Sequence, residues 1–265
     1  MNRIDKTFKE LKQKKESALV GFVTAGDPDI DTSMAIISAM CEAGVDILEL
    51  GIPFSDPTAD GPVIQRSSQR ALKQGVTLQK VLSMTAELRQ TFSIPIILFS
   101  YYNPILAFGL KEFYTAAKAA QADGLLVVDL PPEESDEMTS LWPDDDLALI
   151  RLIAPTTPAE RMVRITESAS GFLYLVSKTG VTGSDGLDVG EISHHTEKLR
   201  AITSLPICVG FGISTPADVA AIASTAEGVV IGSAFERTIE ENHEDPNLAA
   251  RLADQVRSLK EATKL

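Results

Sequence analysis

The chain has 265 residues, of which 44% are hydrophobic and 23% are charged, a composition typical of a globular protein with a large core. Its formal net charge of −13 argues against nucleic acid as a partner, because phosphate backbones bind basic surfaces, although a small anionic ligand responds to local dipoles. Residues 1–20 lack the apolar stretch of a signal peptide, and no apolar run reaches membrane-spanning length, so a cytoplasmic protein with no membrane segment is expected.

Helical and strand-like segments alternate along the chain. An amphipathic helix is expected over residues 1–15, before the first strand. Strand-like apolar runs occupy residues 18–24, 45–51, 94–101, 123–130, 147–154, 171–177, 206–212 and 228–234. Helical periodicity is found between strands at residues 31–44, 63–75, 77–90 and 110–121, and in the closing segment 247–265. Thr157-Pro158 and Ser214-Thr215-Pro216 predict helix starts after the fifth and seventh strands.

This alternation predicts the fold class. Short apolar strands separated by helices indicate a parallel sheet that is covered by helices. Eight such units without a leftover strand favour a closed barrel over an open doubly wound sheet. We therefore predict an α/β fold, a single (β/α)8 TIM barrel with an extra N-terminal helix, formed by one domain over residues 1–265. Cys41 and Cys208, far apart in apolar surroundings, are expected to be buried free thiols.

Glu49 is the first candidate for a reacting group. It lies near the end of the second strand, and active sites of these barrels lie at the carboxyl ends of the strands. Strand alternation places Glu49 on the face opposite Leu48 and Leu50, so its side chain should point into the barrel mouth. A partly desolvated carboxyl group there has a raised pKa and can exchange protons near neutral pH. The alternative is a structural ion pair with Arg or Lys.

The loop after this strand, GIPFSDPTADGP (51–62), combines two aspartates with three prolines, which restrict its backbone. Asp56 and Asp60 are candidates for substrate contacts. Their alternative role is that of turn residues, since each precedes a residue typical of turns.

Three glycine-rich strand ends predict a phosphate site. VGFGIS (209–214) and VVIGSAF (229–235) follow the seventh and eighth strands, where this fold commonly binds phosphate with backbone amides and a short helix. SKTGVTGSDG (177–186), after the sixth strand, could close over the same site, with Gly183 as a donor and Lys178 as the only basic residue of the set. Each glycine pair alone could simply form a turn.

Together these stretches resemble the α subunit of tryptophan synthase. The matching segments are GFVTAGDP (21–28), ELGIPFSDPTADGP (49–62), VVDLPPEES (127–135), YLVSKTGVTG (174–183), VGFGIS (209–214) and VVIGSAF (229–235). The resemblance implies a lyase that cleaves indole-3-glycerol phosphate to indole and glyceraldehyde 3-phosphate by a retro-aldol reaction, without a metal or organic cofactor. It also implies an α2β2 complex with a pyridoxal-phosphate-dependent β subunit. Thr58 and Lys178 depart from the family's usual leucine and arginine.

The resemblance assigns roles to individual residues. Glu49 would be the catalytic acid and base, and Asp60 would accept a hydrogen bond from the indole N–H. The residues expected to contact substrate are Phe22, Tyr101 and Asp129 in the indole pocket, Tyr174 beside Glu49, Thr182 in the loop that links to Asp60, and Gly183, Gly212, Gly232 and Ser233 at the phosphate. Without the resemblance, the sequence favours packing in the barrel core as the role of Phe22 and Tyr101.

Two other functions are compatible with the sequence. The chain could be another phosphate-binding barrel of isomerase or synthase type, although the aspartate-rich loop argues against that. It could also be a regulatory subunit that activates a β enzyme without catalysis of its own, although a scaffold needs neither Glu49 nor Asp60.

Overall fold

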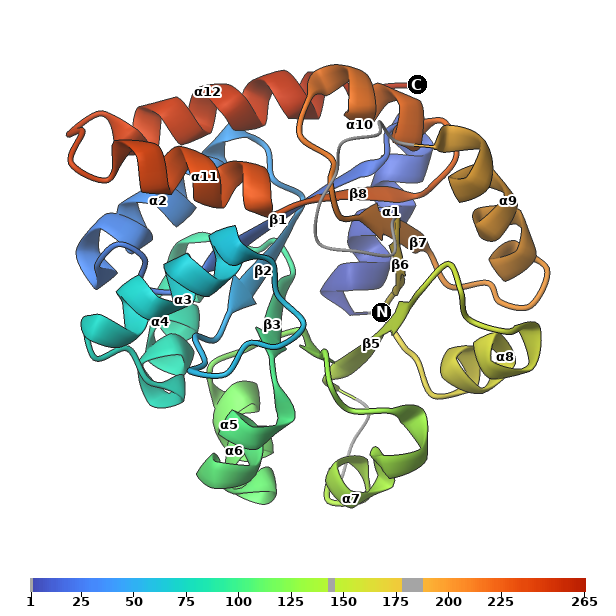
Figure 1. The fold of residues 1–265 in the computed structure, drawn as a ribbon, viewed down its shortest axis with the longest axis horizontal. Helices are drawn as coiled ribbons and strands as arrows, with labels where there is room; N and C mark the ends of the chain where they lie inside the picture. The colour runs from blue at the N-terminus through green and yellow to red at the C-terminus, as the bar shows by residue number, and fades with distance from the viewer. Residues whose placement is uncertain (1, 143–145, 178–187) are drawn as a thin grey trace.

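Eight parallel strands close into a barrel in the computed structural model, which describes residues 2–142, 146–177 and 188–265 (Figure 1). Each strand pairs with the next along the chain, and β8 pairs with β1. The strands are β1 Ala18–Thr24, β2 Ile47–Gly51, β3 Ile96–Ser100, β4 Gly124–Val127, β5 Ala148–Ile153, β6 Leu173–Val176, β7 Ile207–Gly210 and β8 Gly228–Ile231. The predicted (β/α)8 barrel is confirmed. Most strands end earlier than predicted, because the apolar runs continue past the last ladder hydrogen bond.

Helices surround the barrel (Figure 1). They are α1 Arg3–Lys14, α2 Ile30–Ala43, α3 Pro62–Lys73, α4 Leu78–Thr91, α5 Tyr102–Phe108, α6 Leu110–Ala119, α7 Asp136–Thr139, α8 Ala159–Glu167, α9 Val189–Arg200, α10 Pro216–Ala223, α11 Ser233–Asn242 and α12 Leu248–Glu261. The short helices α5 and α7 were not predicted, since neither is long enough to show a helical period.

The two predicted helix starts differ in their chemistry. Thr215 caps α10 through a capping box with Asp218, as its sequence indicates. α8 begins at Ala159, but Thr157 does not cap it. The Thr157 hydroxyl instead accepts a hydrogen bond from the Ala154 N–H at 3.1 Å, which closes the turn between β5 and α8.

Two apolar clusters form the core. The larger one lies between the strands and the outer helices, and the smaller one fills the barrel interior. The interior cluster includes Ile4, Phe8 and Leu11, all from α1. α1 therefore closes the amino-terminal end of the barrel and leaves the carboxyl-terminal end for a site.

Side-chain alternation along β2 agrees with the prediction for Glu49. Leu48 and Leu50 belong to the cluster beneath the helices, whereas Ile47 belongs to the barrel interior, and so Glu49 points inward. The strand register places Glu49 between Phe22 of β1 and Ile97 of β3. Cys208 is buried and Cys41 is partly buried, and both are free thiols, as predicted.

Candidate active site

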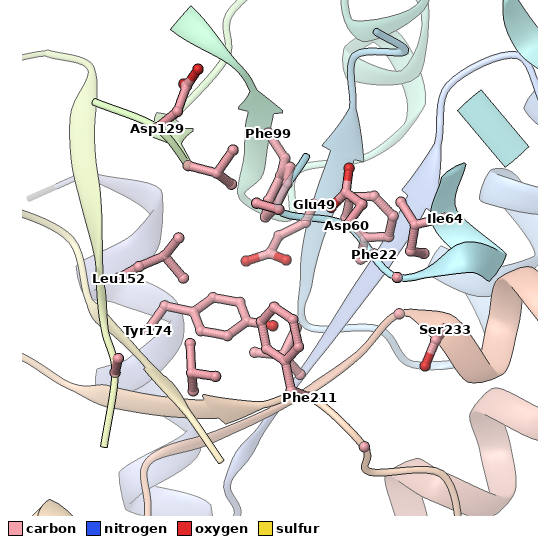
Figure 2. Close-up of a pocket in the computed structure, with 18 of the residues that line it drawn as sticks. Phe22, Glu49, Asp60, Ile64, Phe99, Asp129, Leu152, Tyr174, Phe211 and Ser233 are labelled. Atoms are coloured by element: carbon pink, nitrogen blue, oxygen red, sulfur yellow. The ribbon is translucent and has the colours of Figure 1, made fainter. Parts of the chain in front are cut away.

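A cavity of about 1040 Å³ opens at the carboxyl-terminal ends of the strands (Figure 2). Its wall contains eight of the predicted site residues: Phe22, Glu49, Asp60, Asp129, Tyr174, Gly212, Gly232 and Ser233. These residues come from β1, β2, β6, the start of α11 and the segments after β2, β4, β7 and β8, so the closed barrel brings together positions that are far apart in the sequence. Tyr101 is absent from the described wall, and Thr182, Gly183 and Lys178 lie outside the described residues.

The carboxyl group of Glu49 projects toward the middle of this cavity, on the side of Tyr174 (Figure 2). Glu49 is fully buried, and neither of its oxygens has a hydrogen-bond partner among the described residues. Burial raises the pKa of Glu49 from 4.5 to about 8. The structural ion pair considered above is therefore not formed within the described part of the chain. Glu49 is a predominantly protonated acid at neutral pH, and it can both donate and accept a proton there.

Asp60 occupies the loop between β2 and α3, across the cavity from Tyr174 (Figure 2). Its burial raises the pKa of the carboxyl group to about 6, against a lowering contribution from a hydrogen bond with Tyr101. Asp56, by contrast, is exposed and accepts a hydrogen bond from the neighbouring Ser55 hydroxyl at 2.5 Å. Of the two aspartates, only Asp60 lies in the cavity wall.

Tyr101 supports this loop from behind the cavity wall. Only 3% of Tyr101 is exposed, and its hydroxyl accepts a hydrogen bond from the Ala59 N–H at 2.9 Å. The same hydroxyl interacts with the Asp60 carboxyl group. Tyr101 thus contacts the Asp60 loop through its hydroxyl, and its contact with the indole ring stays a prediction.

Aromatic and apolar side chains form the remaining walls (Figure 2). Phe22 makes an edge contact with Phe99 at a centroid distance of 5.0 Å, and Tyr174 makes one with Phe211 at 6.0 Å. Phe22 is thus both a core residue and a wall residue, so the two roles that the sequence left open are compatible. Sequence reasoning missed Phe99 and Phe211. Strand alternation could have identified Phe99, which is two residues beyond the inward-facing Ile97.

Gly210 determines where the Tyr174 ring lies. A Cβ atom at position 210 would overlap the Tyr174 hydroxyl and the ring carbons next to it. We expect Gly210→Ala to displace Tyr174 from the cavity wall and to lower kcat/KM by roughly 10- to 100-fold. Steady-state kinetics would measure this effect. Gly190→Ala, on α9, serves as the control, because the added methyl group is outside the cavity wall and meets only the end of the Asp188 side chain among the described residues, at 3.3 Å, where a small shift accommodates it. Unchanged kinetics in Gly210→Ala would show that catalysis does not depend on the position of the Tyr174 ring.

The phosphate site predicted at the ends of β7 and β8 has suitable backbone geometry. Gly212 has a φ of +77°, and a Cβ at this position would face open space. Gly232 precedes α11, which has no side-chain cap, so the first N–H groups of this helix are available to an anion. The helix also carries a residue that the sequence reasoning missed: the exposed Arg237, which lines the cavity one turn beyond Ser233. Arg237 could have been identified from its spacing, because residues four positions apart lie on the same face of a helix and Ser233 was already a predicted site residue.

No cluster of three or more His, Cys, Asp or Glu side chains that could hold a metal ion occurs in residues 2–142, 146–177 and 188–265. Within the same residues, no helix combines the length and apolar character needed to cross a membrane.

A closed (β/α)8 barrel, with a buried acid at its carboxyl-terminal mouth that has no hydrogen-bond partner in the described part of the chain, defines the class of the protein as a barrel enzyme. Comparison with known proteins narrows this class. The family model described as "Tryptophan synthase alpha chain" matches residues 8–264, and by this match the chain belongs to that family.

Relatives and solved structures agree with this assignment. The chain is 67% identical over 265 residues to the tryptophan synthase alpha chain of Desulfosudis oleivorans and 60% identical over 264 residues to that of Desulfatibacillum aliphaticivorans, with 100% of each chain covered. A structure of tryptophan synthase subunit alpha from Legionella pneumophila has a TM-score of 0.91 at 39% identity, covering 99% of this chain and 98% of the other. A Mycobacterium tuberculosis tryptophan synthase chain has a TM-score of 0.91 at 31% identity, covering 100% and 99%.

Proposed function

We propose that the protein cleaves indole-3-glycerol phosphate to indole and glyceraldehyde 3-phosphate, the α half-reaction of tryptophan biosynthesis. The observation that supports this most is the Glu49 carboxyl group, which is buried and unpartnered among the described residues and is aimed into an aromatic-walled cavity. Membership of the tryptophan synthase alpha chain family supports the same reaction.

In the proposed mechanism, the protonated Glu49 gives its proton to C3 of the indole ring. The ring then accepts the electron pair of the bond to the glycerol side chain. As that bond breaks, the Glu49 carboxylate removes the proton of the adjacent side-chain hydroxyl, which becomes the aldehyde of glyceraldehyde 3-phosphate. One proton is given and one is taken, so Glu49 returns to its starting state.

Asp60 performs the complementary task in this scheme. It accepts a hydrogen bond from the indole N–H and stabilises the positive charge that develops on the ring. With a pKa of about 6, Asp60 is mostly ionised at pH 7, whereas Glu49, with a pKa of about 8, is mostly protonated. Different surroundings thus keep Glu49 neutral and Asp60 ionised in the same cavity. Glu49 needs its proton to act as an acid, and Asp60 needs its negative charge to stabilise the ring.

We expect Asp60→Asn to lower kcat/KM by about 10²-fold, because the amide cannot stabilise positive charge as a carboxylate does. The acidic limb of the pH–rate profile near pH 6, which reports ionisation of Asp60, should also disappear. Kinetics between pH 5 and pH 9 would measure both effects.

Asp56→Asn on the same loop is the matched control, since Asp56 is exposed and should tolerate the change. An acidic limb that persists in Asp60→Asn would assign that ionisation to another group.

The proposed contacts for the phosphate are Gly212, Gly232 and Ser233, with Gly183 from the segment after β6. Thr182 is proposed to link that segment to Asp60. Phe22, Asp129 and Tyr174 are the proposed contacts for the indole and glycerol parts. Tyr101 is proposed to act through the Asp60 loop. We further propose that the protein works in the cytoplasm, in an α2β2 complex with a pyridoxal-phosphate-dependent β subunit.

Indole release from indole-3-glycerol phosphate tests the function, measured for the chain alone and with its β subunit. The proposal expects release in both cases. Activation of the β subunit without any indole release would indicate a regulatory scaffold. Turnover of a ribose or thiamine phosphate, with indole-3-glycerol phosphate inert, would indicate a different phosphate-binding barrel.

A further inference from the structure

A network of charged side chains joins α11 to α3 on the outer side of the cavity wall. Arg66 donates to both oxygens of Glu240, at 2.6 and 2.7 Å. Arg70 donates to Glu240 at 3.0 Å and to both oxygens of the buried Asp27 at 2.7 Å. The two helices connected in this way pack against each other (Figure 1).

Glu236 is the buried member of this network. It is fully buried in the first turn of α11, where its N–H donates to the Gly232 carbonyl oxygen at 3.1 Å. Its Oε1 accepts a hydrogen bond of 2.6 Å from the Thr24 N–H, at the end of β1. Its Oε2 makes no hydrogen bond of normal geometry among the described residues, but the Glu236 side chain interacts with the Asp27 carboxylate, to which a protonated Glu236 can donate. Burial, and next the nearby Asp27 carboxylate, raise the pKa of Glu236 well above its ordinary value.

The ion pairs of the network leave Glu236 without a cation of its own. Arg66 is paired with Glu240, and Arg70 is shared between Asp27 and Glu240, so three carboxyl groups face two guanidinium groups. An ionised Glu236 would be a buried charge beside the Asp27 carboxylate, which is costly. When Glu236 is neutral, in contrast, no charge is buried, and its Oε1 still accepts the hydrogen bond from the Thr24 N–H.

These contacts hold one side of the cavity. Ser233, at the start of α11, lines the cavity beside the chain segment that leads from Asp60 into α3 (Figure 2), and Gly232 precedes it. The Thr24 hydroxyl also lies 2.7 Å from the Ser67 hydroxyl of α3, and Ser67 donates to the carbonyl oxygen of Ile64, another wall residue. The end of β1 is therefore the point at which α11 and α3 are fixed relative to each other.

We propose that Glu236 is a positioning residue for the phosphate end of the cavity, which ties the first turn of α11 to the end of β1 and so places the backbone amides near Gly232 and Ser233. This inference rests on the proposed function. It adds that the affinity for the phosphate group of the substrate depends on a side chain that does not touch the substrate.

The test is calorimetric titration of the full chain with glycerol 3-phosphate, using two substitutions at one position. Glu236→Gln keeps a neutral acceptor for the Thr24 N–H and should bind within about twofold of the wild type. Glu236→Leu fills the same space but leaves the buried Thr24 N–H without an acceptor, so it should weaken binding roughly tenfold. The KM for substrate should rise in parallel, with kcat little changed.

Leu259→Ala provides the control for general destabilisation, because it removes a buried side chain of α12 and should lower Tm without changing glycerol 3-phosphate binding. Wild-type binding by Glu236→Leu would overturn the inference, and so would equal losses in Glu236→Gln and Glu236→Leu. Neither result affects the proposed reaction. Absence of indole release from a wild type that still binds glycerol 3-phosphate would overturn the reaction instead.

Discussion

We expect Glu49→Gln to abolish indole formation while the barrel stays folded. The amide has nearly the shape of the acid but can neither deliver a proton to indole C3 nor remove one from the side-chain hydroxyl. Because Glu49 performs both transfers in the proposed mechanism, kcat should fall by at least about 10³-fold. Single-turnover indole release, with far-ultraviolet circular dichroism to verify folding, would measure the effect.

Glu167→Gln is the matched control for this loss. Glu167 lies on the exposed surface of α8, away from the cavity, so the same chemical change there should leave kcat unaltered. If Glu49→Gln retained more than about a tenth of the wild-type rate, a loss too small for general acid–base catalysis, Glu49 would not be the acid and base.

The same substitution should change the pH dependence of stability. Glu49 is protonated in the folded protein up to pH 8 or so, whereas it ionises near 4.5 in the unfolded chain. The folded state therefore binds the extra proton between these values, and the free energy of unfolding falls as pH rises through that window. The loss amounts to about 5 kcal/mol in total, at about 1.4 kcal/mol per pH unit.

Glu49→Gln lacks this proton and should not show the loss. Its stability relative to the wild type should therefore increase by about 5 kcal/mol between pH 4.5 and pH 8, and the difference should become constant above pH 8. Urea unfolding at several pH values would measure it. A pH-independent difference would mean that Glu49 has an ordinary pKa in the folded protein, and the proton-transfer role would then lose its physical basis.

These two predictions describe opposite effects of Glu49 on activity and on stability. The acid that the proposed reaction needs is buried in an aromatic-walled cavity without a described partner, which costs folding free energy at neutral pH. A substitution at Glu49 should therefore remove activity while its stability relative to the wild type rises with pH, whereas a substitution elsewhere in the core should not show this combination. Leu259→Ala, for example, should lower stability at every pH by a similar amount.

The architecture could be predicted from sequence because it depends on local periodicity. Eight apolar runs separated by helical segments were enough to identify the closed barrel. The inward direction of Glu49 was also predictable, since a strand has a side-chain period of two and Leu48 and Leu50 occupy the other face. The assignment of individual site residues came mainly from family resemblance, and eight of those residues line one cavity.

The tertiary structure decided which groups meet. Neither the absence of a described partner for Glu49 nor the position of Tyr101 behind the Asp60 loop follows from any local pattern. The hydrogen bond between Thr24 and Glu236 joins residues 212 positions apart. Such contacts depend on the closure of the barrel, which brings the ends of distant strands to one rim. Periodicity determines the face on which a side chain lies, but the electrostatic state of a buried acid depends on everything packed around it.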